Sequence, residues 1–151
     1  MKKITFLFLI CMLTSSSVHA QKNKVPFTVA KNYFVVNNYP EKELHMLKIV
    51  DEQQFDHIFG KAPLAGKNGQ ATPLDFSKSF VIALIDEVSN TTEELSVKSL
   101  PKEGTNLLLQ YEIKQRKEVS CASFRFYALI VVDNRYEGTI SGRKFNFFLT
   151  L

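Results

Sequence analysis

The sequence has few of the residues on which catalytic and metal sites usually depend. Its 151 residues include two cysteines, three histidines and no tryptophan. No H-E-x-x-H, paired C-x-x-C, G-x-S-x-G or calcium-loop spacing occurs in it. These absences argue against the common hydrolases. With two histidines and one cysteine beyond residue 20, the chain is expected to have no metal site and no cofactor.

Long apolar runs are also missing, and the apolar stretch near the start is too short to cross a membrane. It covers residues 4–13, follows Lys2 and Lys3, and precedes an A-x-A-like site that ends at Ala20. This order of segments is typical of a secretory signal peptide. We therefore expect cleavage near Ala20, which leaves residues 21–151 as a single globular domain in the periplasm or outside the cell, with no membrane span.

Basic and acidic residues are present in nearly equal numbers. Without the two lysines of the signal segment, 17 basic residues remain against 15 acidic residues. The tightest basic cluster, residues 114–117, lies between Glu112 and Glu118. Because a nucleic-acid surface needs clustered Lys and Arg, this mixing of charges predicts no nucleic-acid partner.

Removal of the signal segment takes Cys11 with it and leaves Cys121 as the single thiol, so no intrachain disulfide can form. A single thiol can act as a nucleophile when a histidine activates it, and His45 and His57 are the candidates. The alternative is a small, buried or half-buried residue at the start of a strand. Cys121 leads into the apolar run of residues 124–132, which favours this structural interpretation.

The pattern of apolar residues predicts an α+β fold, a mainly antiparallel β-sheet with one short helix near residues 51–59. Asp51 followed by Gln54 matches a capping box, which places the start of the helix. Apolar side chains recur at helical spacing up to Phe59, and we expect Gly60 to end the helix.

Strands are expected in both halves of the chain. Residues 80–85 are continuously apolar, and residues 124–132 are apolar on both faces, with Phe124 at the start of the inward face. Both strands should therefore be covered on two sides, and short connections before residue 115 predict antiparallel neighbours. Further strands are expected at residues 33–36, 45–50, 95–97, 107–113, 136–140 and 145–149, with turns at residues 86–92, 101–104 and 141–142.

Residues 61–73 lack a periodic apolar pattern and are rich in proline and glycine, which predicts a long loop. Long loops in small domains frequently carry function. Leu64, Lys67 and Asn68 are our candidates in this loop for contact with a partner.

The long loop leads into residues 72–78, T-P-L-D-F-S-K, and then into the apolar strand at residues 80–85. A strand and the short helix ending at Phe59 precede it. This order resembles the C-terminal domain of protease-complex-subunit (PrcB-like) proteins, exported bacterial domains named after an accessory subunit of a surface protease. The resemblance covers about residues 40–133.

The D-F-S-K motif also has a structural interpretation. Asp75 stands just before a buried strand, where its carboxylate can accept hydrogen bonds from backbone amides of the preceding loop. Phe76 can fill the core below it. We therefore expect Asp75 and Phe76 to stabilise the fold and not to take part in a reaction.

Three functions remain open at this point. The missing catalytic motifs, the long loop and the family resemblance predict an exported, non-enzymatic domain that binds another exported protein, as an accessory subunit or inhibitor of a protease. The first alternative is a small-ligand carrier in the cell envelope, with its ligand between sheet and helix. The second is a thiol enzyme that uses Cys121 with His45 or His57.

Overall fold

The computed structural model describes residues 23–40, 43–63 and 69–145. Strands dominate these residues, and most strand pairs are antiparallel, so the predicted α+β fold with one short α-helix is confirmed. The elements are β1 (Asn23–Lys24), β2 (Thr28–Val29), β3 (Tyr33–Val35), β4 (His45–Ile49), α1 (Glu52–Ile58), β5 (Phe59–Lys61), β6 (Ser79–Ser99), β7 (Pro101–Glu103), β8 (Asn106–Asp133), the 3-10 helix η1 (Asn134–Tyr136) and β9 (Thr139–Lys144).

The two longest strands, β6 and β8, form one antiparallel ribbon. The pairing of β6 with β8 starts with Ser79 opposite Asp133. β7, which follows β6 in the chain, continues the pairing with β8 up to Glu103 opposite Asn106. A two-residue turn joins these last two residues. Gly104 in this turn has a φ of 62°, a left-handed conformation that glycine adopts without strain.

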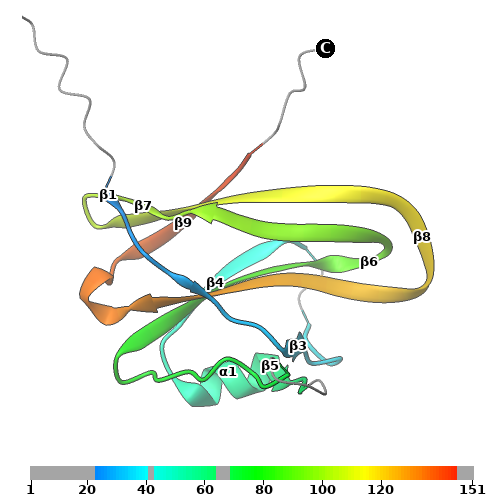
Figure 1. Cartoon of the computed structure of the whole chain (residues 1–151), viewed down its shortest axis with the longest axis horizontal. Coiled ribbons are helices and arrows are strands. Elements are labelled where there is room, and N and C mark those ends of the chain that lie inside the picture. Colours follow the sequence, from blue (N-terminus) through cyan, green and yellow to red (C-terminus); the bar gives the residue numbers. More distant parts are fainter. Residues whose placement is uncertain (1–22, 41–42, 64–68, 146–151) are drawn as a thin grey trace, which may run out of the picture.

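The ribbon folds back on itself, so each long strand lies in two layers (Figure 1). Residues 79–85 of β6 and 127–133 of β8 form the inner sheet, which β4 and β2 extend. Residues 94–99 of β6 and 106–114 of β8 form the outer sheet, together with β1, β7 and β9. The inner sheet carries this name because other elements cover both of its faces.

Both strands stay paired where the ribbon bends. Register shifts between Ile85 and Glu93 let β8 take the longer path around the bend. The turn predicted at residues 86–92 is therefore wrong: the segment is strand, because its backbone pairs with β8 although all of its side chains except Val88 are polar. Phe124, expected to face the core, lies in this bend and is 50% exposed.

Side chains of the inner sheet alternate between two cores. Phe80 of β6 and Ile130 of β8 lie in the first core, between the two sheets. Their neighbours Val81 and Leu129 lie in the second core, on the opposite face. All four residues are at most 1% exposed. Both strands are thus covered on both faces, as their apolar sequences predict.

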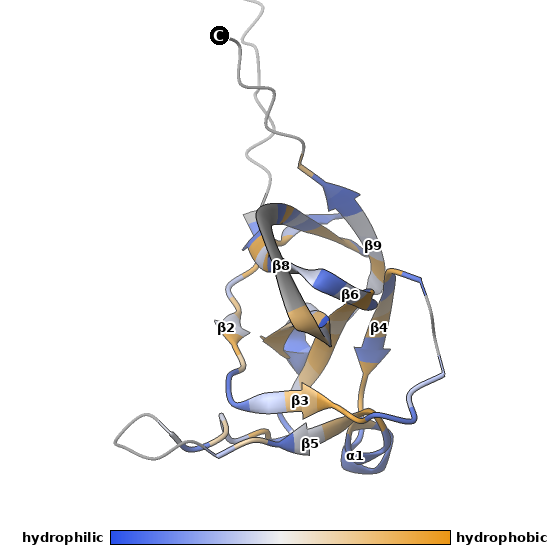
Figure 2. Cartoon of the chain, turned by 90° about the vertical axis from the view of Figure 1, so that its right-hand side faces the viewer, coloured by the Kyte–Doolittle hydropathy of each residue, from blue (hydrophilic) through white to orange (hydrophobic). Residues whose placement is uncertain are grey.

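α1 and the β3–β5 pair form a third layer, which covers the second face of the inner sheet (Figure 2). The helix starts where the capping box predicts: Asp51 is the N-cap, and its Oδ1 accepts from the Gln54 N–H at 2.7 Å. Phe55 and Ile58 point into the second core. The described part of the chain contains no helix that is long and apolar enough to cross a membrane.

The helix ends at Ile58, so the prediction that Gly60 ends it is wrong. Phe59 is already extended and pairs with Val35, because β5 starts there and joins β3. Gly60 has a different role: the ring of Phe34 occupies the space that a Cβ at this position would take.

β9 lies beside the first part of β8, in a parallel pairing. It runs through Ser141 and Gly142, so the turn predicted at these two residues is wrong. Phe145, predicted to start another inward-facing strand, is 41% exposed and follows β9 without belonging to a strand. The rest of that predicted strand, residues 146–149, lies outside the described residues.

The N-terminal segment crosses from one sheet to the other. β1 pairs antiparallel with β7 in the outer sheet, and β2 pairs antiparallel with β8 in the inner sheet. Between these strands, Val25 is buried in the first core, and its N–H donates to the carbonyl oxygen of Leu100 at 2.8 Å. The segment thereby closes part of one open side of the sandwich.

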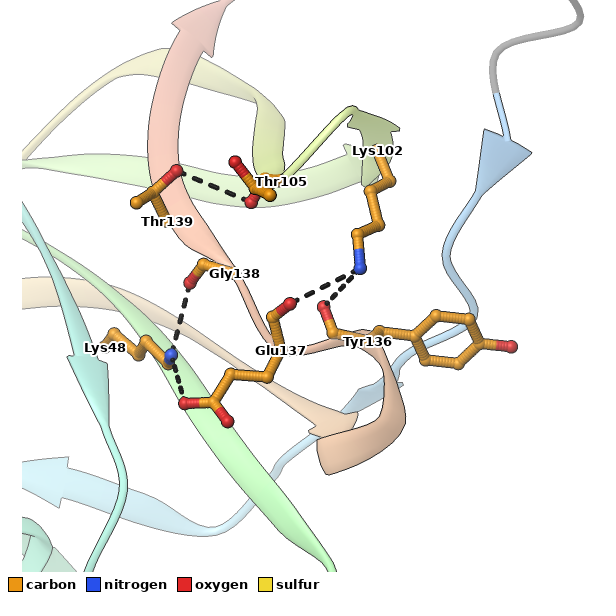
Figure 3. A network of polar contacts seen from close by, with 7 residues as sticks. All are labelled: Lys48, Lys102, Thr105, Tyr136, Glu137, Gly138 and Thr139. Atoms are coloured by element: carbon orange, nitrogen blue, oxygen red, sulfur yellow. Dashed lines mark hydrogen bonds and ion pairs between the residues drawn. The ribbon is translucent and has the colours of Figure 1, made fainter.

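A network of polar contacts fixes the link between η1 and β9 (Figure 3). Lys48 of β4 donates to Glu137 Oε1 at 2.9 Å and to Gly138 O at 3.2 Å. Lys102 of β7 donates to the carbonyl oxygens of Tyr136 and Glu137. Because β4 belongs to the inner sheet and β7 to the outer sheet, the two lysines tie this link to both layers.

Candidate functional site

A cleft of about 570 Å³ opens in the third layer. Its walls are α1, the facing ends of β3 and β5, and residues 69–76, which lead from the long loop toward β6. Sites for small molecules have volumes of this order. The described lining residues are Tyr33, Glu52, Phe55, Asp56, Lys61, Pro63, Gly69, Gln70, Ala71, Thr72, Pro73, Leu74 and Phe76.

Aromatic side chains form the floor of the cleft. Tyr33 and Phe55 are 5% and 3% exposed, and their rings meet edge to face with centroids 5.1 Å apart. Phe76 lies 5.9 Å from Phe55 between ring centroids and is half-buried, as are Ala71 and Leu74. A group that enters the cleft would therefore bury apolar surface at its base.

Hydrogen bonds hold the segment after the long loop against the start of β3. Tyr33 Oη donates to Thr72 O at 2.6 Å, and Asn32 Nδ2 donates to Gln70 O at 2.8 Å. The Lys31 N–H donates to Thr72 Oγ1, and the Thr72 N–H donates to Lys31 O. These contacts fix one wall, so the cleft is already formed before any group enters it.

The charges around the cleft are divided between its walls. Glu52 and Asp56 are exposed on α1, four residues apart and thus on one helix face. Lys61 stands on the β5 wall. Burial raises the pKa of the Tyr33 phenol, and the negative charge of Asp56 raises it further. The negative charge of Asp56 therefore affects Tyr33 on the floor of the cleft, although the carboxylate itself lies on the rim.

Of the two residues expected to stabilise the fold, Phe76 lines the cleft and Asp75 does not. Asp75 Oδ1 accepts from the Ser77 N–H at 3.1 Å and from Ser77 Oγ at 2.5 Å, and Oδ2 pairs with Lys78 Nζ at 3.0 Å. These partners follow Asp75, whereas the sequence predicts amides of the preceding loop. The Ser77 hydroxyl and then Lys78 lower the pKa of Asp75. Phe76 packs against the second core.

The three residues predicted for partner contact, Leu64, Lys67 and Asn68, lie outside the described residues. The structure describes the chain up to Pro63 and again from Gly69, and both of these residues line the cleft. The long loop therefore starts and ends at the cleft.

Cys121 is exposed in the bend of β8. This position contradicts the prediction of a buried or half-buried residue at a strand start, because the strand begins well before Cys121 and bends away from both cores there.

The surroundings of the two candidate histidines differ from those of the Cys121 thiol. His45 Nε2 lies 2.5 Å from Tyr39 Oη, and His45 Nδ1 lies 2.8 Å from Glu43 O. His57 is exposed on α1. Within the described ranges, no hydrogen bond joins either histidine to Cys121, and no three His, Cys, Asp or Glu side chains gather closely enough to hold a metal ion.

The sequence pattern predicts the loop of the cleft but gives no prediction for Glu52 and Asp56. Their signal is two acids four residues apart on the polar side of a helix. This pattern is usual on solvated helix surfaces, so it does not predict a site unless the opposite wall is known.

Comparison with known proteins adds no relative. No protein-family model, no curated protein and no solved structure matches the chain.

Proposed function

We propose that the chain is an exported, non-enzymatic protein-binding domain, and that the cleft holds a side chain of its exported partner. The observation that carries this proposal is the preformed cleft itself, with an aromatic floor and two carboxylates on one wall. The order of segments that resembles PrcB-like domains supports a protease as the partner, with this chain as accessory subunit or inhibitor. Its location is then the periplasm or the cell exterior.

The chemistry of the cleft specifies the side chain that would enter it. The half-buried surfaces of Leu74 and Phe76 would contact an aliphatic stem. Glu52 and Asp56 would lie beside a positive charge at the end of that stem. A lysine or arginine side chain has both parts. A site of this kind, with an anchor side chain in a pocket, is typical of the centre of a protein interface.

The proposal can be tested by capture of the partner from envelope and culture-medium fractions, followed by mass spectrometry. We expect the tagged protein to retain one exported partner in stoichiometric amount. Asp56→Lys should abolish capture, because it reverses the charge at the rim. Gln53→Lys is the control for a new lysine on α1, because it places this side chain at an exposed position that does not line the cleft. Asp56→Asn and Gln53→Lys each change the charge by one unit, so this second pair is matched in charge, and only Asp56→Asn should weaken capture. Equal capture by both variants would contradict the proposal.

The volume of the cleft also favours a second candidate, a carrier of a small ligand in the cell envelope. A cleft of about 570 Å³ is in the range that small-molecule sites occupy. A carrier purified from its native source should release a small molecule on denaturation, and mass spectrometry of the supernatant would detect it. Release of such a molecule, together with an empty protein capture, would favour the carrier.

A further inference from the structure

The cleft in the third layer carries charges of both signs that do not pair with each other. Glu52 and Asp56 lie on its α1 wall and Lys61 on its β5 wall, and all three are exposed. None of the ion pairs between described side chains includes any of them. A single positive group in the cleft would attract the two acids but would repel Lys61. An occupant that also carries a negative group would be attracted by both walls.

The strand register places Lys61 beside the floor of the cleft. Lys61 lies directly opposite Tyr33 in the antiparallel β3–β5 pair. Their side chains are therefore neighbours on one face of this pair. The ring of Tyr33 in turn meets the ring of Phe55, which belongs to α1. The two aromatic rings thus connect the wall that carries Lys61 with the helix that carries the acids.

Asp56 approaches Tyr33 from the helix. Burial and then the negative charge of Asp56 raise the pKa of the Tyr33 phenol, so this carboxylate lies within electrostatic reach of the ring. Asp56 and Lys61 therefore border the same aromatic side chain, one from α1 and one from β5. α1 and the β3–β5 pair lie side by side in the third layer (Figure 2). The cleft between them has an acidic wall, an apolar floor and a basic wall.

One kind of amino-acid residue carries both charges at the two ends of an apolar stem. A lysine or arginine at the C-terminus of a chain has a positive side-chain group and a negative α-carboxylate, with methylene groups between them. Apolar surface for these methylene groups is present, because Leu74 and Phe76 line the cleft and are half-buried. Within a chain, the same residue has no carboxylate and would leave Lys61 without a partner.

We propose that the cleft binds a lysine or arginine at the C-terminus of the partner protein. The side-chain cation lies beside Glu52 and Asp56. The methylene groups contact Leu74 and Phe76, and the α-carboxylate pairs with Lys61. Capture of a C-terminal carboxylate is a recurring mode of peptide recognition, and charge-assisted bonds at both ends of one residue fix its orientation. The inference rests on the proposed function for the existence of a protein partner, and it adds which part of that partner enters the cleft.

Labelled peptides of alanine and serine test the need for both charges on the purified protein, with fluorescence anisotropy as the measure of affinity. One peptide ends in lysine with a free carboxylate, a second ends in the amide of lysine, and a third has its lysine in the middle. We expect the first peptide to bind about tenfold more tightly than the other two, because it alone presents a carboxylate on the same residue as the cation. Unlabelled free lysine should compete more weakly than the first peptide.

Variants of the two walls test each end of the bound residue separately. Lys61→Gln should abolish the difference between the free-acid and amide peptides, because it removes the partner of the carboxylate. Lys31→Gln is the matched control, since it removes the same charge from an exposed lysine that does not line the cleft, and it should keep the difference. Asp56→Asn should weaken binding of both peptides by the same factor, because it acts on the cation.

The captured partner provides a second test. A carboxypeptidase that removes C-terminal lysine and arginine should abolish capture when it is applied to the envelope and culture-medium fractions, with the inactivated enzyme as control. Capture that survives this treatment but is lost in Asp56→Lys would reject this inference and leave the proposed function intact.

Four results with the peptides would also overturn the inference. They are no binding by any peptide, equal binding of the free-acid and amide peptides, the same effect of Lys61→Gln and Lys31→Gln, and competition by free lysine as strong as that by the first peptide. The last result would favour the small-ligand carrier.

Discussion

Tyr33 of β3 donates its phenolic hydrogen to the carbonyl oxygen of Thr72, with the two oxygens 2.6 Å apart. This bond joins the third layer to the segment that leads into β6. Burial, and then the charge of Asp56, raise the pKa of Tyr33, so the phenol keeps its hydrogen well above neutral pH. One wall of the cleft therefore depends on a donor that stays protonated over the physiological range.

Removal of this hydroxyl should loosen the wall. We expect Tyr33→Phe to lower the free energy of unfolding by about 1 kcal/mol, because a part-buried carbonyl loses its donor. Urea unfolding measures the change. Tyr136→Phe is the control, because the Tyr136 hydroxyl points away from the network in Figure 3. The same loss in both variants would show that the bond to Thr72 contributes no more to the free energy of unfolding than the Tyr136 hydroxyl does.

Two glycines of the η1–β9 region should respond very differently to one added methyl group. A Cβ at Gly138 would overlap the carbonyl oxygen of Thr105, whereas a Cβ at Gly142 would lie 3.4 Å from Tyr111 Cε1. We expect Gly138→Ala to lower the free energy of unfolding by about 2 kcal/mol, and Gly142→Ala by less than about 1 kcal/mol. Thermal and urea unfolding check the order. A larger loss at Gly142 would contradict the packing described for β9.

The pKa of Asp75 should make the turn before β6 sensitive to acid. Its pKa is lowered in the folded protein from an ordinary value of 3.8, chiefly by the Ser77 hydroxyl and then by Lys78. Stabilisation by a carboxylate of this kind is present above the ordinary pKa and is lost as the pH falls through the lower, folded-state value.

We therefore expect Asp75→Asn to be less stable than the unaltered protein near neutral pH. The difference should shrink as the pH falls below the ordinary pKa. Urea midpoints across this range measure it, with Glu87→Gln as a control at an exposed carboxylate. A difference that stays constant with pH would mean that the side chain acts through its shape and not through its charge.

Cys121 should react as an ordinary exposed thiol. We expect iodoacetamide to modify the folded protein and the urea-unfolded protein at rates within about threefold of each other, because the side chain is accessible in both states. His45→Ala should leave the rate unchanged, since Tyr39 and Glu43 occupy the two ring nitrogens. A slower reaction in His45→Ala would instead support the thiol-enzyme alternative.

The buried parts of the fold were the most predictable from sequence. Residues 80–85 can be apolar at every position only if both faces are covered, and both are. Asp51 and Gln54 locate the start of α1 because capping depends on local geometry. The bend of the ribbon at residues 86–92 has no such signal, because backbone pairing holds it and its side chains are those of a turn.

The candidate site was less predictable. Residues 61–73 identify a long loop by composition, and Pro63 and Gly69 do border the cleft. Glu52 and Asp56 line a cleft only because β3 and β5 lie opposite them. These strands come from separate parts of the chain, so the sequence near α1 does not show the cleft.

The pairing of β2 with the end of β8 also sets the order in which the molecule can form. Thr28 lies opposite Val131, so β2, near the start of the chain, has no partner until the end of β8 exists. Contacts between such distant residues carry a large loop-closure entropy and slow the search for the native state. A chain that emerges from its N-terminus therefore keeps β2 unpaired until β8 is complete. We therefore expect β2 to join the sandwich only after nearly the whole polypeptide has been synthesised.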